Sequence, residues 1–150
     1  MEIVCREIER NDFGNNFPEI LAQLTVLGDV KNPLSIYDNM IKKEDYKIFI
    51  IKISDDPRII GAATLHLERK FIHGGKPVGN IEDVVVDENH RAKGFGRILV
   101  EKCYREAKRL GCYKAKLTCS EKNVAFYEKL GFERKGVEMG MYFEYDKQQE

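Results

Sequence analysis

Residues Ile81–Val100 read IEDVVVDENHRAKGFGRILV, and this stretch decides the fold of the chain. The apolar run Val84–Val86 is typical of a buried strand, and it passes through a polar turn into Arg91-x-x-Gly94-x-Gly96 and then into a helix pattern. Glycines let the backbone approach a ligand closely, while the first turn of a helix presents free N–H groups and partial positive charge. The stretch therefore predicts a cradle for an anion such as a pyrophosphate.

The Gly-x-Gly pattern by itself leaves a second interpretation open. A Walker A loop is absent, and the dinucleotide fingerprint Gly-x-Gly-x-x-Gly fails because Leu99 occupies the third glycine position. A tight strand-to-helix turn with solvated charges on Arg91, Lys93 and Arg97 would give the same pattern. Spacing alone does not decide between a phosphate cradle and such a turn.

Outward from this stretch, strand and helix patterns alternate along the chain. Apolar residues at helical spacing predict helices, while β-rich runs bounded by turn residues predict strands. Strands are expected at Glu2–Ile8, Tyr46–Ile53, Ile59–Ile72, Ile81–Val86, Lys114–Cys119 and Val137–Tyr145. Helices are expected at Pro18–Leu27, Pro33–Lys43, Gly94–Leu110 and Asn123–Leu130.

The order of these elements, β-α-α-β-β-β-α-β-α-β, predicts an α/β (α+β) fold with a mixed, mainly antiparallel sheet flanked by helices. The strand–helix–strand unit from Ile81 to Cys119 requires at least one parallel pair, because a crossover helix returns the chain to the same end of the sheet. With 150 residues and no repeat or linker, the chain is expected to form a single domain over residues 1–150.

Composition argues against several classes of function. The 25 Lys and Arg residues balance the 25 Asp and Glu residues, whereas a sequence-independent nucleic-acid binder needs a basic excess. No apolar run reaches the roughly 20 residues that span a bilayer, and the charged start Met1–Arg10 is unlike a secretory signal. The four cysteines form no Cys-x-x-Cys pair and are not spaced with histidines as zinc ligands. These features predict a cytoplasmic protein with reduced thiols and with no metal, nucleic-acid or membrane partner.

The Arg-x-x-Gly-x-Gly motif after an apolar strand resembles the acetyl-CoA motif of the GNAT superfamily of N-acetyltransferases. Asn123–Phe132, NVAFYEKLGF, resembles the second segment that this superfamily shares. Leu67–His73 and Gly79–Val86 are similar to the corresponding segments of the eukaryotic glucosamine 6-phosphate N-acetyltransferases, and this likeness extends over nearly the whole chain.

The resemblance implies a transferase of the GNAT fold that uses acetyl-CoA as its co-substrate. Its expected reaction moves the acetyl group to the amine of glucosamine 6-phosphate and gives N-acetylglucosamine 6-phosphate and CoA, a step of UDP-N-acetylglucosamine biosynthesis. Transfer is expected to be direct, without an acyl-enzyme on any cysteine. The resemblance also implies a homodimer in which the second subunit supplies part of the substrate pocket.

Residue roles are carried over from the same resemblance. Cofactor binding is expected at Val84, Val85, Val86, Arg91, Ala92, Lys93, Gly94, Phe95, Gly96, Arg97, Asn123 and Tyr127. Substrate binding is expected at Gly28, Lys70, Phe71, Ile72, His73, Glu82, Asp83, Val84, Tyr113 and Lys114. Catalysis is expected to involve Asp83 and Tyr127, with Tyr127 as the proton donor to the leaving thiolate.

Each role has a plain structural alternative. Tyr127 could be a helix-surface aromatic packed on the sheet, and Lys70 and His73 could be polar residues at a hairpin end. Neighbouring residues of a strand point to opposite faces, so Glu82 and Asp83 cannot both face one ligand unless the backbone is bulged.

Three positions depart from the family pattern. Asn80 replaces the usual His or Arg, Thr118 replaces a common acidic residue, and Gly140–Phe143 lacks the arginine that meets the sugar phosphate in many members. Transfer to another small amine and a non-catalytic acyl-CoA-binding sensor therefore stay open as alternatives.

Overall fold

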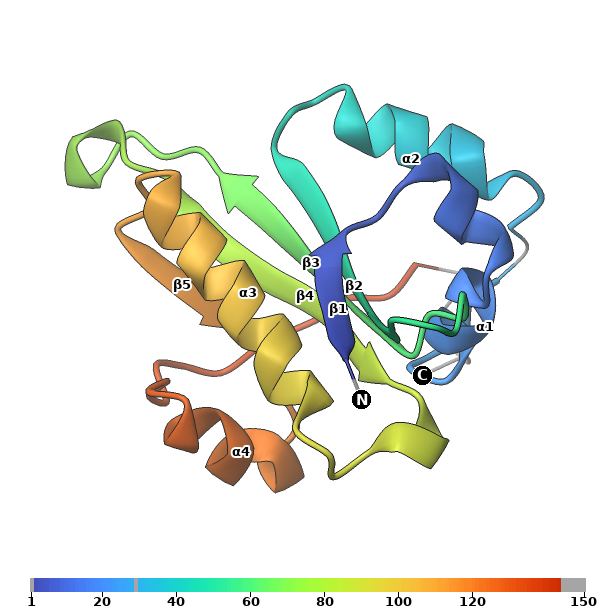
Figure 1. Cartoon of the computed structure of the whole chain (residues 1–150). Coiled ribbons are helices and arrows are strands. Elements are labelled where there is room, and N and C mark those ends of the chain that lie inside the picture. Colours follow the sequence, from blue (N-terminus) through green and yellow to red (C-terminus); the bar gives the residue numbers. More distant parts are fainter. Residues whose placement is uncertain (1, 29, 144–150) are drawn as a thin grey trace. The chain divides into compact units, whose positions relative to one another are not determined.

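The computed structural model describes residues 2–28 and 30–143 (Figure 1). The chain forms two compact units, the first ending at Leu117 and the second beginning at Thr118. Among the helices in these described ranges, none is both long enough and apolar enough to cross a membrane. The prediction of one domain over residues 1–150 stays a prediction.

The first unit is built on one five-stranded sheet. Its strands are β1 (Ile3–Glu7), β2 (Tyr46–Ile53), β3 (Gly61–Glu68), β4 (Val78–Val86) and β5 (Lys114–Leu117), and they lie in that order across the sheet. The first three pairs are antiparallel, and β4 pairs with β5 in parallel. This arrangement confirms the predicted fold class, including the parallel pair across the long helix.

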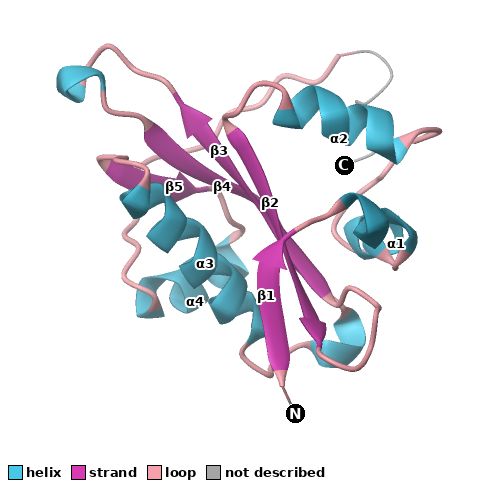
Figure 2. Cartoon of the chain, turned by 45° about the horizontal axis from the view of Figure 1, so that its top comes forward, coloured by secondary structure: helices cyan, strands magenta, loops and turns pink. Residues whose placement is uncertain are grey.

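Helices cover both faces of this sheet (Figure 2). On one face lies α3 (Phe95–Arg109), whose Leu99, Val100 and Cys103 are fully buried. On the other face lie α1 (Phe17–Ala22) and α2 (Pro33–Ile41). That side has its own apolar cluster, formed by Ile8, Phe17, Ile20, Ile48, Ile50, Ile59, Ala62 and Val85. The two cores hold β4 between α3 and α1, and β4 carries the central part of the predicted site.

Several predicted boundaries differ from the structure. Helix α1 ends at Ala22 rather than Leu27, because Thr25 and Val26 are β-branched residues with low helix propensity. Strand β3 ends at Glu68, which pairs with Val78 at the start of β4, so the connection begins earlier than the apolar pattern suggested. The connection contains the short 3-10 helix η2 (His73–Gly75), and all three of its residues have positive φ.

The second unit holds the 3-10 helix η4 (Glu121–Asn123) and the helix α4 (Val124–Lys129), which lies within the predicted Asn123–Leu130. The predicted strand Val137–Tyr145 is wrong for its described part, because residues 137–143 form no strand. Their alternating apolar side chains, Val137, Met139, Met141 and Phe143, are 71–92% exposed. A strand is stable only where a neighbouring strand completes its hydrogen-bond ladder, and no pairing includes these residues. Residues 144 and 145 lie outside the described residues.

Candidate active site on strand β4 and the turn into helix α3

A β-bulge interrupts β4 at the residues predicted to hold the substrate. Thr64 of β3 pairs with Glu82, whereas Ala62 pairs with Val85, so one residue of β3 opposes two residues of β4. The extra residue gives Asp83 a left-handed backbone with φ 52°. Paired residues share a face of the sheet, so the bulge brings Glu82 and Val85 to the same face despite the two residues between them. The condition under which Glu82 and Asp83 can face one ligand is therefore met.

The bulge coincides with the point where β4 loses its second neighbour. Pairing with β5 ends at Ile81 and Leu117, while β4 continues to Val86. Among the described residues, no strand pairs with Val84–Val86 on the side of β5, so the backbone groups of this edge can meet an extended ligand, apart from the carbonyl oxygen of Val86, which accepts from Arg91 Nε. Val84, Val85 and Val86, which are predicted to bind the cofactor, lie on this edge.

The chain then forms the turn that was predicted to be an anion cradle. After the 3-10 helix η3 (Glu88–His90), Ala92 and Gly94 both have left-handed backbones, with φ 61° and 84°. Gly94 is the N-cap of α3, whose 15 residues begin at Phe95. Helix geometry leaves the first amide N–H groups of α3 without intrahelical acceptors, and the helix dipole adds positive potential there. A left-handed residue two positions before Gly94 tightens the turn, which the glycine pattern alone did not predict.

Three basic side chains surround the cradle. Arg91 donates from Nε to the carbonyl oxygen of Val86 over 3.1 Å, so its guanidinium is held beside the end of β4. Arg97 Nε lies 2.7 Å from Glu101 Oε1, and this contact raises the pKa of Arg97. Lys93 is exposed. Positive charge, a left-handed loop and free helix amides fit a pyrophosphate, so these residues suit the phosphates of acetyl-CoA.

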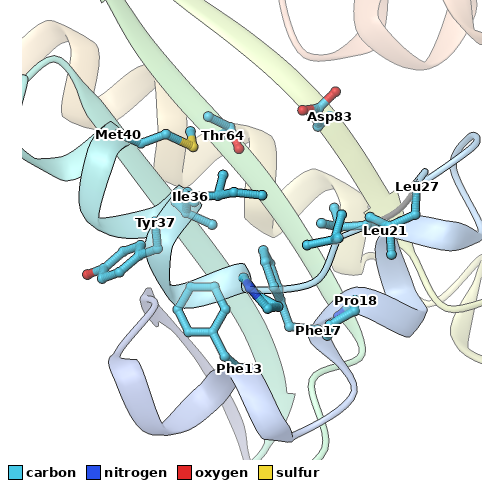
Figure 3. A pocket seen from close by; sticks show the side chains of 13 residues that line it. Phe13, Phe17, Pro18, Leu21, Leu27, Ile36, Tyr37, Met40, Thr64 and Asp83 are labelled. Carbon is cyan, nitrogen blue, oxygen red and sulfur yellow. The ribbon is translucent and has the colours of Figure 1, made fainter. Parts of the chain in front are cut away.

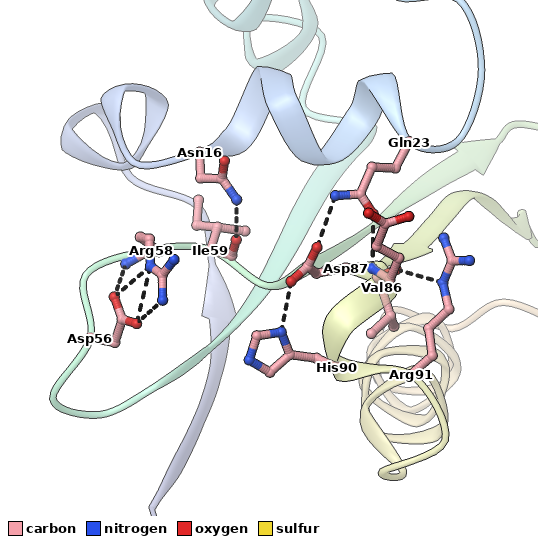
Figure 4. A network of polar contacts seen from close by, with 10 residues as sticks. Asn16, Gln23, Asp56, Arg58, Ile59, Val86, Asp87, His90 and Arg91 are labelled. Carbon is pink, nitrogen blue, oxygen red and sulfur yellow. Dashed lines mark hydrogen bonds and ion pairs between the residues drawn. The ribbon is translucent and has the colours of Figure 1, made fainter.

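A polar network that the sequence did not indicate ties α1 to the start of this turn (Figure 4). Gln23, just after α1, donates to Asp87 Oδ1 over 2.9 Å and accepts from the backbone N–H of Glu88 over 2.9 Å. His90 Nδ1 lies 2.7 Å from the other carboxylate oxygen of Asp87. The hydrogen bond from Gln23, followed by that with His90, lowers the pKa of Asp87. The network fixes the turn that precedes the cradle.

An apolar pocket lies beside the bulge, on the face of the sheet covered by α1 and α2 (Figure 3). Its volume is about 230 Å³. Eleven of its thirteen described lining residues are apolar or aromatic, and the other two are Thr64 and Asp83. Leu27 and Val30, which flank the predicted substrate residue Gly28, are among the apolar ones. Gly28 itself is exposed and left-handed, with φ 73°.

The remaining predicted substrate residues gather at the opposite end of β4. The His73 ring stacks on Tyr113 with 3.9 Å between centroids, and Lys114 Nζ lies 5.7 Å from the Tyr113 ring. Lys114 pairs with Val78, five positions before Asp83, which corresponds to roughly 15 Å along the strand. Nearby Phe71 and Ile72 are exposed, and Lys70 pairs with Glu68 over 3.1 Å. A single chain therefore does not bring this group beside Asp83.

In the second unit, Asn123 and Tyr127 belong to the segment that forms α4. Asn123 is the exposed N-cap of the helix. Tyr127 is half-buried, and its ring makes edge contacts with Phe126 at 4.9 Å and Phe132 at 5.9 Å. A packing role for the ring is therefore present, and the chemical role of its hydroxyl stays a prediction.

The cysteines of the first unit are poor nucleophiles at neutral pH. Burial raises the pKa of Cys103 to about 12 and also raises the pKa values of Cys5 and Cys112. A thiol reacts as its thiolate, so these raised values favour direct transfer over an acyl-enzyme on those residues. Within residues 2–28 and 30–143, no three His, Cys, Asp or Glu side chains group as metal ligands. The absence of a metal from the reaction stays a prediction.

Comparison with known proteins agrees with this geometry. The sequence pattern of the Acetyltransferase (GNAT) family matches residues 6–132. Glucosamine 6-phosphate N-acetyltransferase 1 of Dictyostelium discoideum is 40% identical over 142 residues, which cover 93% of this chain and 90% of the relative. The crystal structure of glucosamine-6-phosphate N-acetyltransferase from Arabidopsis thaliana has a TM-score of 0.87 at 34% identity, covering 96% of this chain and all of that one. An acetyltransferase of Trypanosoma brucei gives the same TM-score at 33% identity. This chain belongs to the GNAT family of acetyltransferases, and within it to the glucosamine 6-phosphate N-acetyltransferases.

Proposed function

We propose that this chain transfers the acetyl group of acetyl-CoA to the amine of glucosamine 6-phosphate. The observation that carries the proposal is the continuous run from the bulge at Asp83, through the unpaired edge of Val84–Val86, into the left-handed cradle before α3. Acetyl-CoA supplies an acetyl thioester, and its pyrophosphate is the anion that the cradle suits. The product is N-acetylglucosamine 6-phosphate, and its use in UDP-N-acetylglucosamine biosynthesis follows as a prediction.

The bulge has two roles in this proposal. It turns the carboxylate of Asp83 to the face that carries Glu82, where two carboxylates hold the amino group of the sugar. It also breaks the regular ladder at Val84, so that a backbone N–H there is directed at the acyl oxygen and stabilises the negative charge that develops on it. Both effects depend on the same bulge, so the bulge would align the amino group of the sugar with the acetyl group of acetyl-CoA.

Tyr127 is proposed to donate a proton to the leaving sulfur. A phenol is protonated at neutral pH and donates one hydrogen bond. The amine of glucosamine lies beside electron-withdrawing oxygens, so it loses its proton more readily than a lysine and needs no strong base. Asp83 is proposed to pair with the ammonium group while it is protonated, and then to accept the proton that the group loses.

We also propose that the working unit is a homodimer. Lys70, His73 and Lys114 lie roughly 15 Å along β4 from Asp83, so a second copy is the natural source of the cations that would meet the sugar phosphate. The alternating apolar residues of 137–143 and the exposed side chains of Phe71 and Ile72 offer surface for such an association.

The acceptor is tested by measuring thiol release from acetyl-CoA with glucosamine 6-phosphate and glucosamine side by side. Loss of the phosphate leaves desolvated cations unpaired, which costs roughly 2–5 kcal/mol. We therefore expect kcat/KM for the phosphorylated sugar to be higher by about 30-fold to several thousand-fold. Equal values for the two sugars would refute the phosphate part of the proposal, and the missing arginine in Gly140–Phe143 would explain the result.

The shared site is tested by mixing subunits. Asp83→Asn and Lys114→Gln should each lose most activity, whereas Lys108→Gln, which changes an exposed lysine on α3, should not. If Asp83 of one subunit works with Lys114 of the other, co-expression of the two inactive variants restores one intact site per mixed dimer. A mixture that stays as inactive as its parents would show that both residues act within one chain or that the protein is monomeric.

A further inference from the structure

The side chain of Gln23 joins two segments of the chain that are assigned to different substrates. Its amide N–H donates to Asp87 Oδ1, and its amide oxygen accepts from the backbone N–H of Glu88, each over 2.9 Å (Figure 4). Both partners belong to the turn that leads from β4 toward the cradle. We call this pair of hydrogen bonds the Gln23 clamp.

On the acceptor side, the clamp lies at the start of a segment without regular structure. Gln23 is the C-cap of α1, and residues 24–28 form no helix or strand. Leu24 and Val26 of this segment are 41% and 51% exposed. Segments with few buried side chains open locally at a small cost in free energy. The segment ends at Gly28, which is predicted to bind the sugar.

On the cofactor side, the turn is held by contacts that lead to the first residue of α3. The backbone N–H of Asp87 donates to the carbonyl oxygen of Ile60 over 2.8 Å. His90 Nδ1 lies 2.7 Å from Asp87 Oδ2, and the His90 ring lies 6.4 Å from the ring of Phe95, between centroids. Phe95 is the first residue of α3 and is 4% exposed. A ligand that steadies the start of α3 therefore also steadies Asp87.

We propose that Gln23 is a positioning residue that transmits the binding of acetyl-CoA to residues 24–28. This inference rests on the proposed function, because it takes the turn before α3 as the cofactor site. The clamp has two states, formed and broken, and a bound pyrophosphate that steadies Asp87 and Glu88 favours the formed state, since less conformational entropy is then left to lose. The formed clamp holds residues 24–28, and with them Gly28, in place for the sugar.

The chemistry of the clamp requires the amide of a glutamine. A side-chain amide has both a donor and an acceptor, whereas a carboxylate only accepts and a backbone N–H only donates. Gln23→Glu would keep the acceptor for Glu88 but would place a second carboxylate against Asp87. Adding Asp87→Asn to that variant supplies a new donor, so the two substitutions together restore the hydrogen bonds with the charge on the opposite partner.

The experiment follows hydrogen exchange of the backbone amides of residues 24–28 in the full chain, without CoA and with CoA at a concentration that saturates each variant. CoA carries the pyrophosphate but no acetyl group, so the measurement requires no transfer. The variants are Gln23→Ala, Gln23→Glu, and Gln23→Glu combined with Asp87→Asn. Glu19→Ala is the matched control, because it truncates an exposed side chain of α1. A merely structural role of Gln23 would change exchange equally with and without CoA, so the ratio of the two rates is the quantity compared.

In the parent, CoA should slow exchange in residues 24–28 about three- to tenfold, which corresponds to one or two hydrogen bonds. This effect should fall below about 1.5-fold in Gln23→Ala and in Gln23→Glu, where the clamp is lost or opposed. It should return when Asp87→Asn is added to Gln23→Glu, and Glu19→Ala should behave like the parent.

The inference is overturned if CoA leaves residues 24–28 of the parent unprotected, if it protects them equally in Gln23→Ala, or if the double variant behaves like Gln23→Ala. The acetylation assay is run on the same parent protein. Acetylation of glucosamine 6-phosphate without protection of residues 24–28 would refute this inference and leave the proposed function intact. Protection that depends on Gln23, without acetylation, would support this inference and refute the proposed function.

Discussion

Substitution of Gly79 by alanine should loosen the contact between β4 and α3, which together carry the candidate site. A Cβ atom at Gly79 would lie 2.7 Å from the Cβ of Ala107 on α3, 3.3 Å from Leu65 Cδ1 and 3.6 Å from Cys112 Sγ. Two carbon atoms are comfortable at about 3.5–4.0 Å. A methyl group on either side has no torsion that could move it away, so the helix itself must shift by roughly 1 Å.

The expected cost follows from the burial of this contact. Ala107 is 1% exposed, and extra methyl groups in a well-packed core typically destabilise a protein by about 1–3 kcal/mol. The β propensity of alanine over glycine offsets part of this, by roughly 0.5–1 kcal/mol. We expect a net loss of about 1–2 kcal/mol, measured by urea denaturation with circular dichroism, provided that the transition is two-state.

Two further variants isolate the steric effect. Gly14→Ala is the matched control, because a Cβ atom there meets nothing within 4 Å, and its stability should equal or exceed that of the parent. Ala107→Gly removes the opposing methyl group and costs about 1 kcal/mol of helix propensity by itself. Combined with Gly79→Ala it should cost less than the two single losses added together. A Gly79→Ala protein as stable as Gly14→Ala, or strict additivity in the double variant, would refute the close approach of β4 and α3.

Three other predictions use the catalytic, electrostatic and network residues. Tyr127→Phe retains the ring contacts with Phe126 and Phe132 but removes the proposed proton donor, so kcat should fall about 10²–10⁴-fold with little change in acetyl-CoA affinity. A kcat within a factor of about two of the parent would leave Tyr127 as a packing residue. Asp12 is 5% exposed and pairs with Arg6 over 2.7 Å, and the hydrogen bonds from Arg6 lower the pKa of Asp12, so the stabilisation by this pair is present above the unfolded-state pKa and is lost as pH falls through the lowered folded-state pKa. The unfolding free energy of the parent minus that of Asp12→Asn, from urea titrations, should be constant at about 1–3 kcal/mol above pH ~5 and shrink below that. A difference independent of pH down to acid unfolding would contradict this. In a double-mutant cycle of Gln23→Ala and Asp87→Ala, the two residues should be coupled by about 0.5–1.5 kcal/mol, and additive losses would mean that the hydrogen bond contributes nothing.

Local sequence patterns were sufficient for most of the secondary structure. The apolar stripe Phe95, Leu99, Cys103, Ala107 and Leu110 predicted α3, and the structure buries the first four residues, while Leu110, the C-cap, is half-buried. The β-rich run Tyr46–Ile53, bounded by turn residues, predicted a strand, and the structure pairs this strand, β2, with β3 in antiparallel. These elements were predictable because each is specified by residues close together in sequence.

Elements that depend on distant partners were less predictable. The strand was predicted to start at Ile81, because Gly79 is typical of a turn, whereas β4 starts at Val78. The structure uses this glycine for the approach of Ala107 from α3, a reason that no local pattern contains. The prediction of a strand at 137–145 was wrong in its described part for the opposite reason, because here the local pattern is present and the distant partner is absent. Its alternation is clear, but no neighbouring strand pairs with residues 137–143.

In the candidate site, too, the residue types could be predicted from the sequence, whereas the backbone geometry could not. The sequence predicted the residue types of the cradle, and the family resemblance implied Glu82 and Asp83, whereas the left-handed backbones of Asp83 and Ala92 follow from tertiary structure. A non-glycine residue in this conformation costs on the order of 1 kcal/mol, and sequence reasoning therefore assigns it to glycine. At Asp83 the register of β3 against β4 imposes the conformation, since Thr64 and Ala62 pair on either side of the extra residue. Asp83 thus combines a strained backbone with a carboxylate. Glycine at this position would relieve the strain, but it would remove the charge that the proposed acceptor amine requires.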